Sequence, residues 1–184
     1  SLQQPDFSLP FSSGYSWAFT GGPHTAWGTG QPLAALDFAP PSVVGGCAPT
    51  DEWSTAVADG IIARTGDAFV ILDLDGDMDE RTGWAIFYLH LANSSIPSVG
   101  TQLKKGDPIG IPSCEGGHAT GTHVHIARKY NGEWIPAEGI LAFNLEGWIA
   151  FNGSAEYQGE LRRFSRVVVA NQSSEISSQI QAGQ

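Results

Sequence analysis

The hydrophobic runs of this chain are short, rich in β-branched and aromatic residues, and separated by turn-forming residues. Such runs are typical of β-strands. They lie at 57–65, 68–75, 83–92, 100–110, 122–137, 147–153 and 166–172. Within the fifth run, Asn131-Gly132 is the kind of residue pair that a tight hairpin turn prefers. The pattern predicts a mainly β, antiparallel fold.

Both ends of the chain lack this pattern. Residues 1–54 are rich in Gly, Pro and Ser, and we expect a loop-rich N-terminal part there. Residues 173–184 are polar, and we expect a mobile or weakly helical tail. A length of 184 residues suits one domain. We therefore predict a single domain, 1–184, whose β core spans 55–172.

Composition and charge narrow the class of protein. A hydrophobic fraction of 41% with only 15% charged residues is that of a globular domain. The net charge of -10 repels phosphate and anionic lipid, which argues against nucleic acid and membranes as partners. The chain has no apolar run long enough to cross a bilayer. Its first residues also lack signal-peptide features, so the protein is either intracellular or a mature form whose leader was removed.

The two cysteines bear on the cellular compartment. Cys47 and Cys114 share no local metal-binding spacing. They are either two buried thiols or a single disulfide, and we favour the disulfide, which would indicate an exported protein.

The histidines carry the candidate chemistry. His123 and His125 are two apart in a predicted strand, so both imidazoles project from one face. Such pairs recur in zinc sites, although they also occur by chance on surfaces. His24 and His118 lie in glycine-rich segments, and His90 ends an apolar strand. These are positions where a shallow cleft could form, so the histidines together predict a metal site.

The order of the motifs resembles the lysostaphin-type zinc metallopeptidases, in particular the staphylolysin, beta-lytic branch. The matching features are the segment Leu9–Trp17, His24 in a Gly-rich loop, Asp37 thirteen residues later, Tyr88-Leu89-His90, Cys114–Gly117, Gly121–His125, and the segments 156–164 and 169–173. The resemblance covers residues 9–174 with all motifs in order. It implies the fold of that family, an antiparallel sheet with a zinc-site groove formed by flanking loops.

The resemblance also implies a metal site. His24, Asp37 and His125 match the family's zinc ligands. Three protein ligands leave a fourth tetrahedral position for water, as catalytic zinc sites require. Zinc can lower the pKa of that water to about 7. We therefore expect one Zn²⁺ per chain.

The family's other site residues are matched as well. His90 and His123 match two catalytic histidines that do not bind the metal. One would take the proton of the attacking water, and the other would stabilise the tetrahedral intermediate or protonate the leaving amine. Tyr157 matches a tyrosine that would hydrogen-bond the substrate carbonyl, although an ordinary half-buried sheet tyrosine is the alternative.

The sequence departs from the family beside the site. Leu89 replaces a tyrosine of staphylolysin. Tyr88 is two residues from His90, so strand parity puts both on one side, and we expect Tyr88 to reach the cleft from another direction. His118 matches nothing in the family, and we expect a loop histidine near the rim of the cleft.

An acidic turn at 73–80 is not explained by the resemblance. Asp73, Asp75, Asp77 and Asp79 alternate around Gly76. Carboxylates this close repel one another unless a cation neutralises them, and Ca²⁺ prefers such oxygen ligands. Asp and Gly are also ordinary hairpin residues. The segment is therefore either a calcium site or a solvated turn.

The resemblance implies a secreted, bacteriolytic zinc metalloendopeptidase. Its substrate would be peptide bonds next to glycine in the cross-links or stem peptides of bacterial peptidoglycan, because a narrow cleft admits a backbone without side chains. We expect a monomer. Two other functions are open: a non-catalytic domain of this fold that binds the cell wall or activates another wall hydrolase, and a calcium-stabilised adhesive or lectin-like domain whose histidines are incidental.

Overall fold

The computed structural model describes all residues, 1–184, and consists almost entirely of antiparallel strands. The main sheet contains β1 (Ser16–Thr25), β2 (Leu33–Ala39), β4 (Gly60–Gly66), β5 (Phe69–Asp73), β6 (Trp84–Leu89), β7 (Gln102–Leu103), β9 (Val124–Tyr130), β10 (Glu133–Trp134) and β15 (Gln179–Gln181). Their order is β15-β1-β2-β9-β6-β5-β4-β7, with β10 paired to β9. The prediction of a mainly β, antiparallel fold is confirmed.

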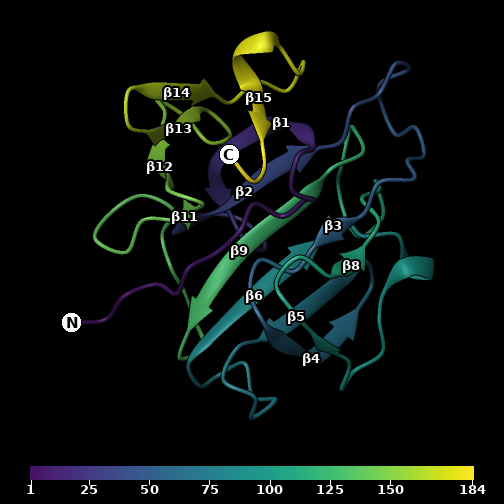
Figure 1. The fold of residues 1–184 in the computed structure, drawn as a ribbon, viewed down its shortest axis with the longest axis vertical. Coiled ribbons are helices and arrows are strands. Elements are labelled where there is room, and N and C mark those ends of the chain that lie inside the picture. Colours follow the sequence, from purple (N-terminus) through teal and green to yellow (C-terminus); the bar gives the residue numbers. More distant parts are fainter.

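Two smaller sheets and two short helical turns complete the fold. A four-stranded sheet contains β11 (Asn144–Leu145), β12 (Trp148–Asn152), β13 (Gly159–Arg163) and β14 (Arg166–Val169). It packs beside β1, at the upper left of Figure 1. β3 (Ser54–Thr55) pairs with β8 (Pro108–Gly110), and the 3₁₀ turns are η1 (Asn93–Ser95) and η2 (Ile176–Ser178). The structure contains no helix with the length and apolarity that crossing a bilayer requires.

The two faces of the main sheet belong to two different clusters of buried side chains. On one face Phe38, Ile126 and Ile86 join the inner residues of the small sheet, such as Trp148, in one large core. The other face carries a smaller second cluster of eight buried residues, which includes Ala35, Ala85 and Ala127. Because side chains alternate along a strand, Asp37 follows Ala35 on this second face, and His125 lies two residues before Ala127 on the same face. The site described below is therefore an extension of the second face.

The N-terminal part is not loop-rich throughout, and that expectation was wrong for residues 16–39. They form β1 and β2, which lie inside the main sheet between β15 and β9. β1 contains Gly21, Gly22 and Pro23, which are depleted in strands, and its pairing with β2 shifts register three times. Because of these residues, the sequence pattern did not predict a strand here.

The C-terminal tail is also ordered: it contains the short turn η2 and then β15, so the expectation of a mobile or weakly helical tail was wrong except for that one helical turn. β15 pairs with β1, and Ile180 and Ala182 are buried in the core. This polar segment joins the sheet because Ile180 and Ala182 alternate with polar residues and point inward, whereas Ile176, before the strand, is exposed. Figure 1 shows this yellow strand alongside β1.

Cys47 and Cys114 form a disulfide, as predicted. It closes a loop across a sequence separation of 67 residues and connects the segment after β2 to the segment before β9. Thr122 strengthens the same connection, because its hydroxyl donates to the carbonyl of Ala48 and its N–H to the carbonyl of Gly46. The two segments that flank the site are thus held to each other.

Candidate metal centre

Three neighbouring strands of the main sheet bring His24, Asp37 and His125 together. Asp37 on β2 lies directly opposite His125 on β9, and His24 comes from β1 on the other side of β2. All three side chains are buried. Of the residues predicted to bind zinc, the structure therefore brings the whole set to one place.

Gly21 makes room for the carboxylate of Asp37. It faces Asp37 across the β1–β2 pair, and a Cβ at this position would overlap the Asp37 side chain. The glycine-rich stretch before His24 is thus required by the close approach of a ligand side chain, which is one of the uses of glycine in a strand.

Backbone carbonyls fix the tautomers of the two histidines. His24 Nδ1 lies 2.7 Å from the carbonyl of Gly22, and His125 Nε2 lies 2.8 Å from the carbonyl of Ala26. A carbonyl oxygen can only accept, so these nitrogens carry the protons in the neutral rings. His24 Nε2 and His125 Nδ1 therefore present lone pairs, as ligating histidines do when the other nitrogen donates to a carbonyl.

The three donor atoms converge. His24 Nε2 lies 3.0 Å from His125 Nδ1, and the two nitrogens lie 3.2 and 3.3 Å from Asp37 Oδ1. Tetrahedral zinc with bonds of about 2.0–2.1 Å requires donors about 3.3 Å apart. Asp37 Oδ1 is buried and accepts no hydrogen bond, so it is an unsatisfied lone-pair donor. Three lone pairs at this spacing repel one another without a cation, so the residues fit a zinc ion.

The protonation states of Asp37 and His125 agree with this assignment. Burial would raise the pKa of Asp37, but the neighbouring His24 and His123 hold it well below its ordinary range. The carboxylate is therefore ionised at neutral pH. Burial lowers the pKa of His125, which keeps this ring neutral and its lone pair available.

His90 and His123 lie beside the donor atoms without joining them. Their ring centroids are 4.7 Å apart, and His123 Nε2 lies 3.7 Å from Asp37 Oδ1. Each Nδ1 is next to a backbone carbonyl, that of Glu115 for His90 and that of Gly121 for His123. Each ring therefore presents a bare Nε2 in its neutral form. Burial, together with His123, lowers the pKa of His90 to about 4, so this ring is neutral at pH 7.

His90 has a backbone conformation that breaks the strand. β6 ends at Leu89, and His90 adopts φ 68°, in the left-handed region. Strand parity therefore does not extend to it. Tyr88 points into the core instead, where its hydroxyl donates to the carbonyl of Thr55 and accepts from the N–H of Val57. The expectation that Tyr88 reaches the cleft was wrong for this reason.

Tyr157 covers the His24 ring. The two rings are stacked with centroids 4.1 Å apart. Tyr157 is 44% exposed and also has a left-handed backbone, φ 70°. Burial raises its pKa, with further contributions from Asp37 and Glu156, so the phenol stays protonated and can donate.

Glu156 holds Tyr157 in position, a role that sequence analysis did not predict. Its carboxylate accepts hydrogen bonds from the N–H and the hydroxyl of Thr25, next to His24. The N–H of Gly22 donates to the carbonyl of Tyr157. An ordinary surface Glu and a Gly in a strand have no sequence pattern that identifies them as anchors.

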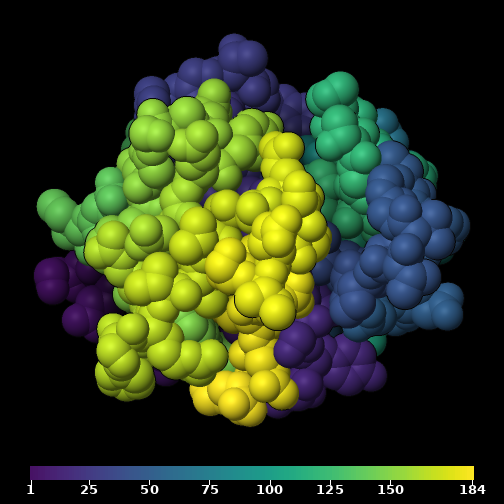
Figure 2. Space-filling model, turned by 90° about the horizontal axis from the view of Figure 1, so that it is seen from above, coloured from purple at the N-terminus to yellow at the C-terminus, as the bar shows by residue number.

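The three proposed zinc ligands and the two neighbouring histidines, His90 and His123, border a groove of about 810 Å³. One wall comes from the segments joined by the disulfide, 40–50 and 118–123, and the other from Tyr157, residues 172–174 and Gln179. Figure 2 shows the yellow C-terminal segment facing the blue and teal segments on this side of the molecule. His118 is exposed and lines the groove, so the prediction of a histidine at its rim is confirmed.

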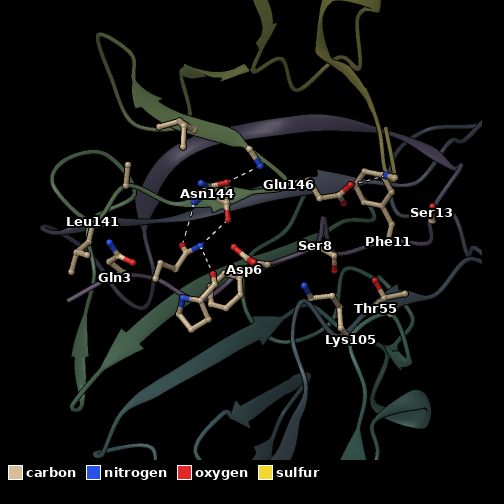
Figure 3. Close-up of a pocket in the computed structure, with 18 of the residues that line it drawn as sticks. Gln3, Asp6, Ser8, Phe11, Ser13, Thr55, Lys105, Leu141, Asn144 and Glu146 are labelled. Atoms are coloured by element: carbon tan, nitrogen blue, oxygen red, sulfur yellow. Dashed lines mark hydrogen bonds between the residues drawn. The ribbon is translucent and has the colours of Figure 1, made fainter. Parts of the chain in front are cut away.

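A second hollow, of about 990 Å³, lies between the N-terminal segment and β11–β12 (Figure 3). Its polar side chains hold chain segments together. The Gln4 amide donates to the carbonyl of Asn144, and the Glu146 carboxylate accepts from the N–H groups of Leu9 and Gly183. No histidine lines this hollow. The clustered histidines thus line the groove and not this hollow.

The acidic turn is placed elsewhere, between β5 and β6. Asp73, Asp75 and Asp77 have carboxylate oxygens within 4.8 Å of one another. Asp79 does not belong to this group, because its carboxylate accepts from the guanidinium of Arg81 at 2.8 and 2.9 Å. The structure thus assembles three of the four predicted calcium ligands.

A buried His–Asp–His donor set in an open groove defines a mononuclear metal site of the hydrolytic type, and comparison with known proteins agrees. No protein-family profile matches the chain. The chain is 30% identical over 165 residues to the beta-lytic metalloendopeptidase of Lysobacter enzymogenes, an alignment that covers 85% of each protein. It is 27% identical over 164 residues to protease LasA of Pseudomonas aeruginosa. The chain belongs to the beta-lytic metalloendopeptidase family, within the M23, lysostaphin-type metallopeptidases.

Solved structures support the family and show the extent of the match. The structure of the M23 metalloprotease pseudoalterin, from the deep sea, superposes with a TM-score of 0.74 at 25% identity and covers 91% of this chain and 96% of that one. The chain spans less than half the length of two of the curated relatives. The match covers 36% of LasA and 41% of the beta-lytic metalloendopeptidase of Achromobacter lyticus.

Proposed function

We propose that this protein is a zinc metalloendopeptidase in which His24, Asp37 and His125 hold the metal. The observation that carries the proposal is the convergence of three lone-pair donors within 3.3 Å, one of them a buried oxygen without a hydrogen bond. Zinc, when bound, supplies Lewis acidity, which polarises a peptide carbonyl and makes water more acidic.

The chain's own groups would move the protons. His90 and His123 each present a bare Nε2 beside the donor set, so either ring can accept the proton of the attacking water. The low pKa of His90 keeps it in the accepting form at neutral pH. A histidine that has gained a proton can then donate it to the leaving amine. The two rings together would accept the proton from water and donate a proton to the leaving amine. Kinetic measurements on single variants would show which ring does which.

Tyr157 would bind the substrate carbonyl. Its raised pKa keeps the phenol a donor, and its stacking on His24 fixes the ring next to the donor set. A fixed hydrogen-bond donor stabilises negative charge that develops on a carbonyl oxygen.

The lining of the groove favours a neutral peptide with small side chains. Apart from its histidines, the lining contains one residue that is charged at neutral pH, Asp37, and no Lys, Arg or Glu. It therefore offers no cation to the carboxylates of acidic stem peptides. A glycine-rich cross-link needs neither charge nor side-chain pockets, so we favour such cross-links in bacterial peptidoglycan as the substrate. The disulfide supports an exported protein, because such bonds persist in oxidising compartments.

The test combines metal analysis with hydrolysis of pentaglycine. The protein should contain about one zinc per chain and cleave pentaglycine, and His125→Ala should lose both. His118→Ala is the matched control, a groove histidine outside the donor set that should keep both. Stoichiometric zinc without hydrolysis of pentaglycine or of purified peptidoglycan would favour the alternative, a non-catalytic domain that binds the wall or activates another hydrolase.

A further inference from the structure

The turn between β5 and β6 gathers three carboxylates at the end of the hairpin opposite His90. Asp73 closes β5 and pairs with Ala85, while Leu89, next to His90, pairs with Phe69 at the other end. Asp75 and Asp77 follow in the turn and are exposed. The cluster therefore lies on the same hairpin as the catalytic groove but far from it.

One carboxylate of the cluster is both buried and unsatisfied. Asp73 has no exposed surface, and its Oδ1 has no hydrogen-bond partner. Its Oδ2 accepts from the N–H of Met78, farther along the same turn, so the carboxylate faces the interior of the turn. Asp75 and Asp77 are there as well, with oxygens within 4.8 Å. A buried, unpaired carboxylate oxygen is costly unless a cation or a hydrogen-bond donor satisfies it.

No basic side chain of the chain neutralises this group. The nearby Arg81 is bonded to Asp79, and Arg64 and Lys129 both bind Glu80. These charges of the turn are thus paired with one another, and the three carboxylates have no cationic partner. Asp75 and Asp77 accept only from the Thr82 hydroxyl and from backbone N–H groups. Burial, opposed by the Met78 N–H but assisted by Asp75 and Asp77, raises the pKa of Asp73 to about 6. Burial of a carboxylate is the main cause of such a rise, and neighbouring like charges add to it.

We propose that Asp73, Asp75 and Asp77 bind a calcium ion that holds the β5–β6 turn. All three donors are carboxylate oxygens, the ligands that Ca²⁺ takes, and no nitrogen or sulfur donor is present to favour zinc. The exposed side of the cluster is open to water, which supplies the further oxygens that Ca²⁺ requires. The site is distinct from the zinc centre in ligands and in place.

Its role is structural. From Ala85 to His90 the chain runs five residues, roughly 17 Å at the rise of a β-strand. Calcium would therefore stabilise the hairpin without contact with the reacting groups. We expect it to raise the melting temperature and to leave kcat and KM unchanged.

The experiment measures thermal unfolding of the zinc-loaded protein with and without CaCl₂, alongside calorimetric titration of Ca²⁺. At a hundredfold excess over Kd, Tm should rise by roughly 5–10 °C. Asp75→Asn/Asp77→Asn should abolish both the rise and the calorimetric signal, and it should fold because both side chains are exposed. Asp79→Asn is the matched control: it removes a carboxylate from the same turn but not from the cluster, and should keep the full response.

Three results would overturn the proposal. The wild-type protein could show neither a Tm rise nor binding heat with Ca²⁺, which leaves only a solvated turn. The double variant could respond as the wild type does, which places the ion elsewhere. Finally, Mg²⁺ could produce an equal rise, which indicates general screening of the charge of -10 and no calcium site.

Discussion

The proposed zinc donor set and the acidic turn are two clusters of candidate metal ligands built in opposite ways. The proposed zinc donors come from three strands, with His24 and His125 separated by 101 residues in sequence, and all three are buried. The acidic donors come from five consecutive residues, and two of the three are exposed. The first cluster is positioned by the whole sheet, and the second by one local turn.

The difference concerns what each ion would do for the protein. In the zinc cluster, carbonyls of Gly22 and Ala26 orient the rings, so the fold itself prepares the site and the ion supplies chemistry. In the acidic turn only Asp73 is fixed by burial, so the ion would supply order. Loss of the first ion should therefore abolish turnover, whereas loss of the second should reduce stability alone.

The largest expected effect is removal of a zinc ligand. His125→Ala leaves Asp37 with one partner fewer and removes one of three donors, so we expect loss of stoichiometric zinc and of measurable hydrolysis. Metal analysis and a pentaglycine assay check this. The same variant should keep its Tm response to Ca²⁺, and a lost response would mean that the two clusters are one coupled system and not two independent ones.

Replacement of a proton-transfer histidine should separate chemistry from metal binding. We expect His90→Ala or His123→Ala to keep bound zinc and to lower kcat by roughly 10²- to 10⁴-fold, the range for a general acid or base. His118→Ala controls for the loss of a groove histidine. Near-normal kcat in both single variants would exclude their proposed role.

The sequence alone was sufficient to name the three residues that the structure brings together as proposed zinc ligands, but not the contacts that hold them there. Local runs of apolar residues predicted most of the strands between β4 and β14, because β-branched and aromatic residues are concentrated in them. β1 carries Gly21, Gly22 and Pro23 because Asp37 and the loop before β13 pack against it, and that reason is visible only in three dimensions. β13, with sequence GELRR, buries only Gly159 and Leu161, too weak a pattern to detect.

The left-handed residues of the site mark a second limit of sequence reasoning. Alternation placed Tyr88 on the side of His90, but the positive φ of His90 turns the chain at that point. Bulky residues rarely adopt this conformation, and no local sequence pattern predicts it. Tyr157 has the same property. Positions of this kind cluster at functional sites, where surrounding structure enforces them.

Removal of the disulfide tests how far the groove walls depend on the link between them. In the chain-entropy model a loop of this length stabilises the fold by about 4 kcal/mol. We expect Cys47→Ser/Cys114→Ser to unfold at markedly lower temperature, measured by calorimetry. KM for pentaglycine should also rise, because both segments of one wall lose their connection. A lower Tm with unchanged KM would show that Thr122 alone holds the wall.

Gly21→Ala should weaken zinc binding although Gly21 does not touch the metal. The added methyl group overlaps the Asp37 carboxylate and must displace it, and overpacking of this kind costs about 1–3 kcal/mol. Zinc affinity should therefore fall by roughly 5- to 150-fold, measured by competition with a chelator. Gly121→Ala is the control, because its added Cβ would lie 3.5 Å from the nearest atom, an ordinary contact.

The smallest expected effect is that of Tyr157→Phe. The variant keeps the ring stacked on His24 but removes the hydroxyl, so zinc content and Tm should stay as in the wild type. If the phenol donates to the substrate carbonyl only as charge develops there, kcat should fall while KM stays constant. A single neutral hydrogen bond is worth about 1–1.5 kcal/mol, which corresponds to roughly a tenfold decrease. Unchanged kcat in Tyr157→Phe, with reduced zinc affinity in Tyr157→Ala, would make Tyr157 a packing residue that positions His24 and takes no part in the chemistry.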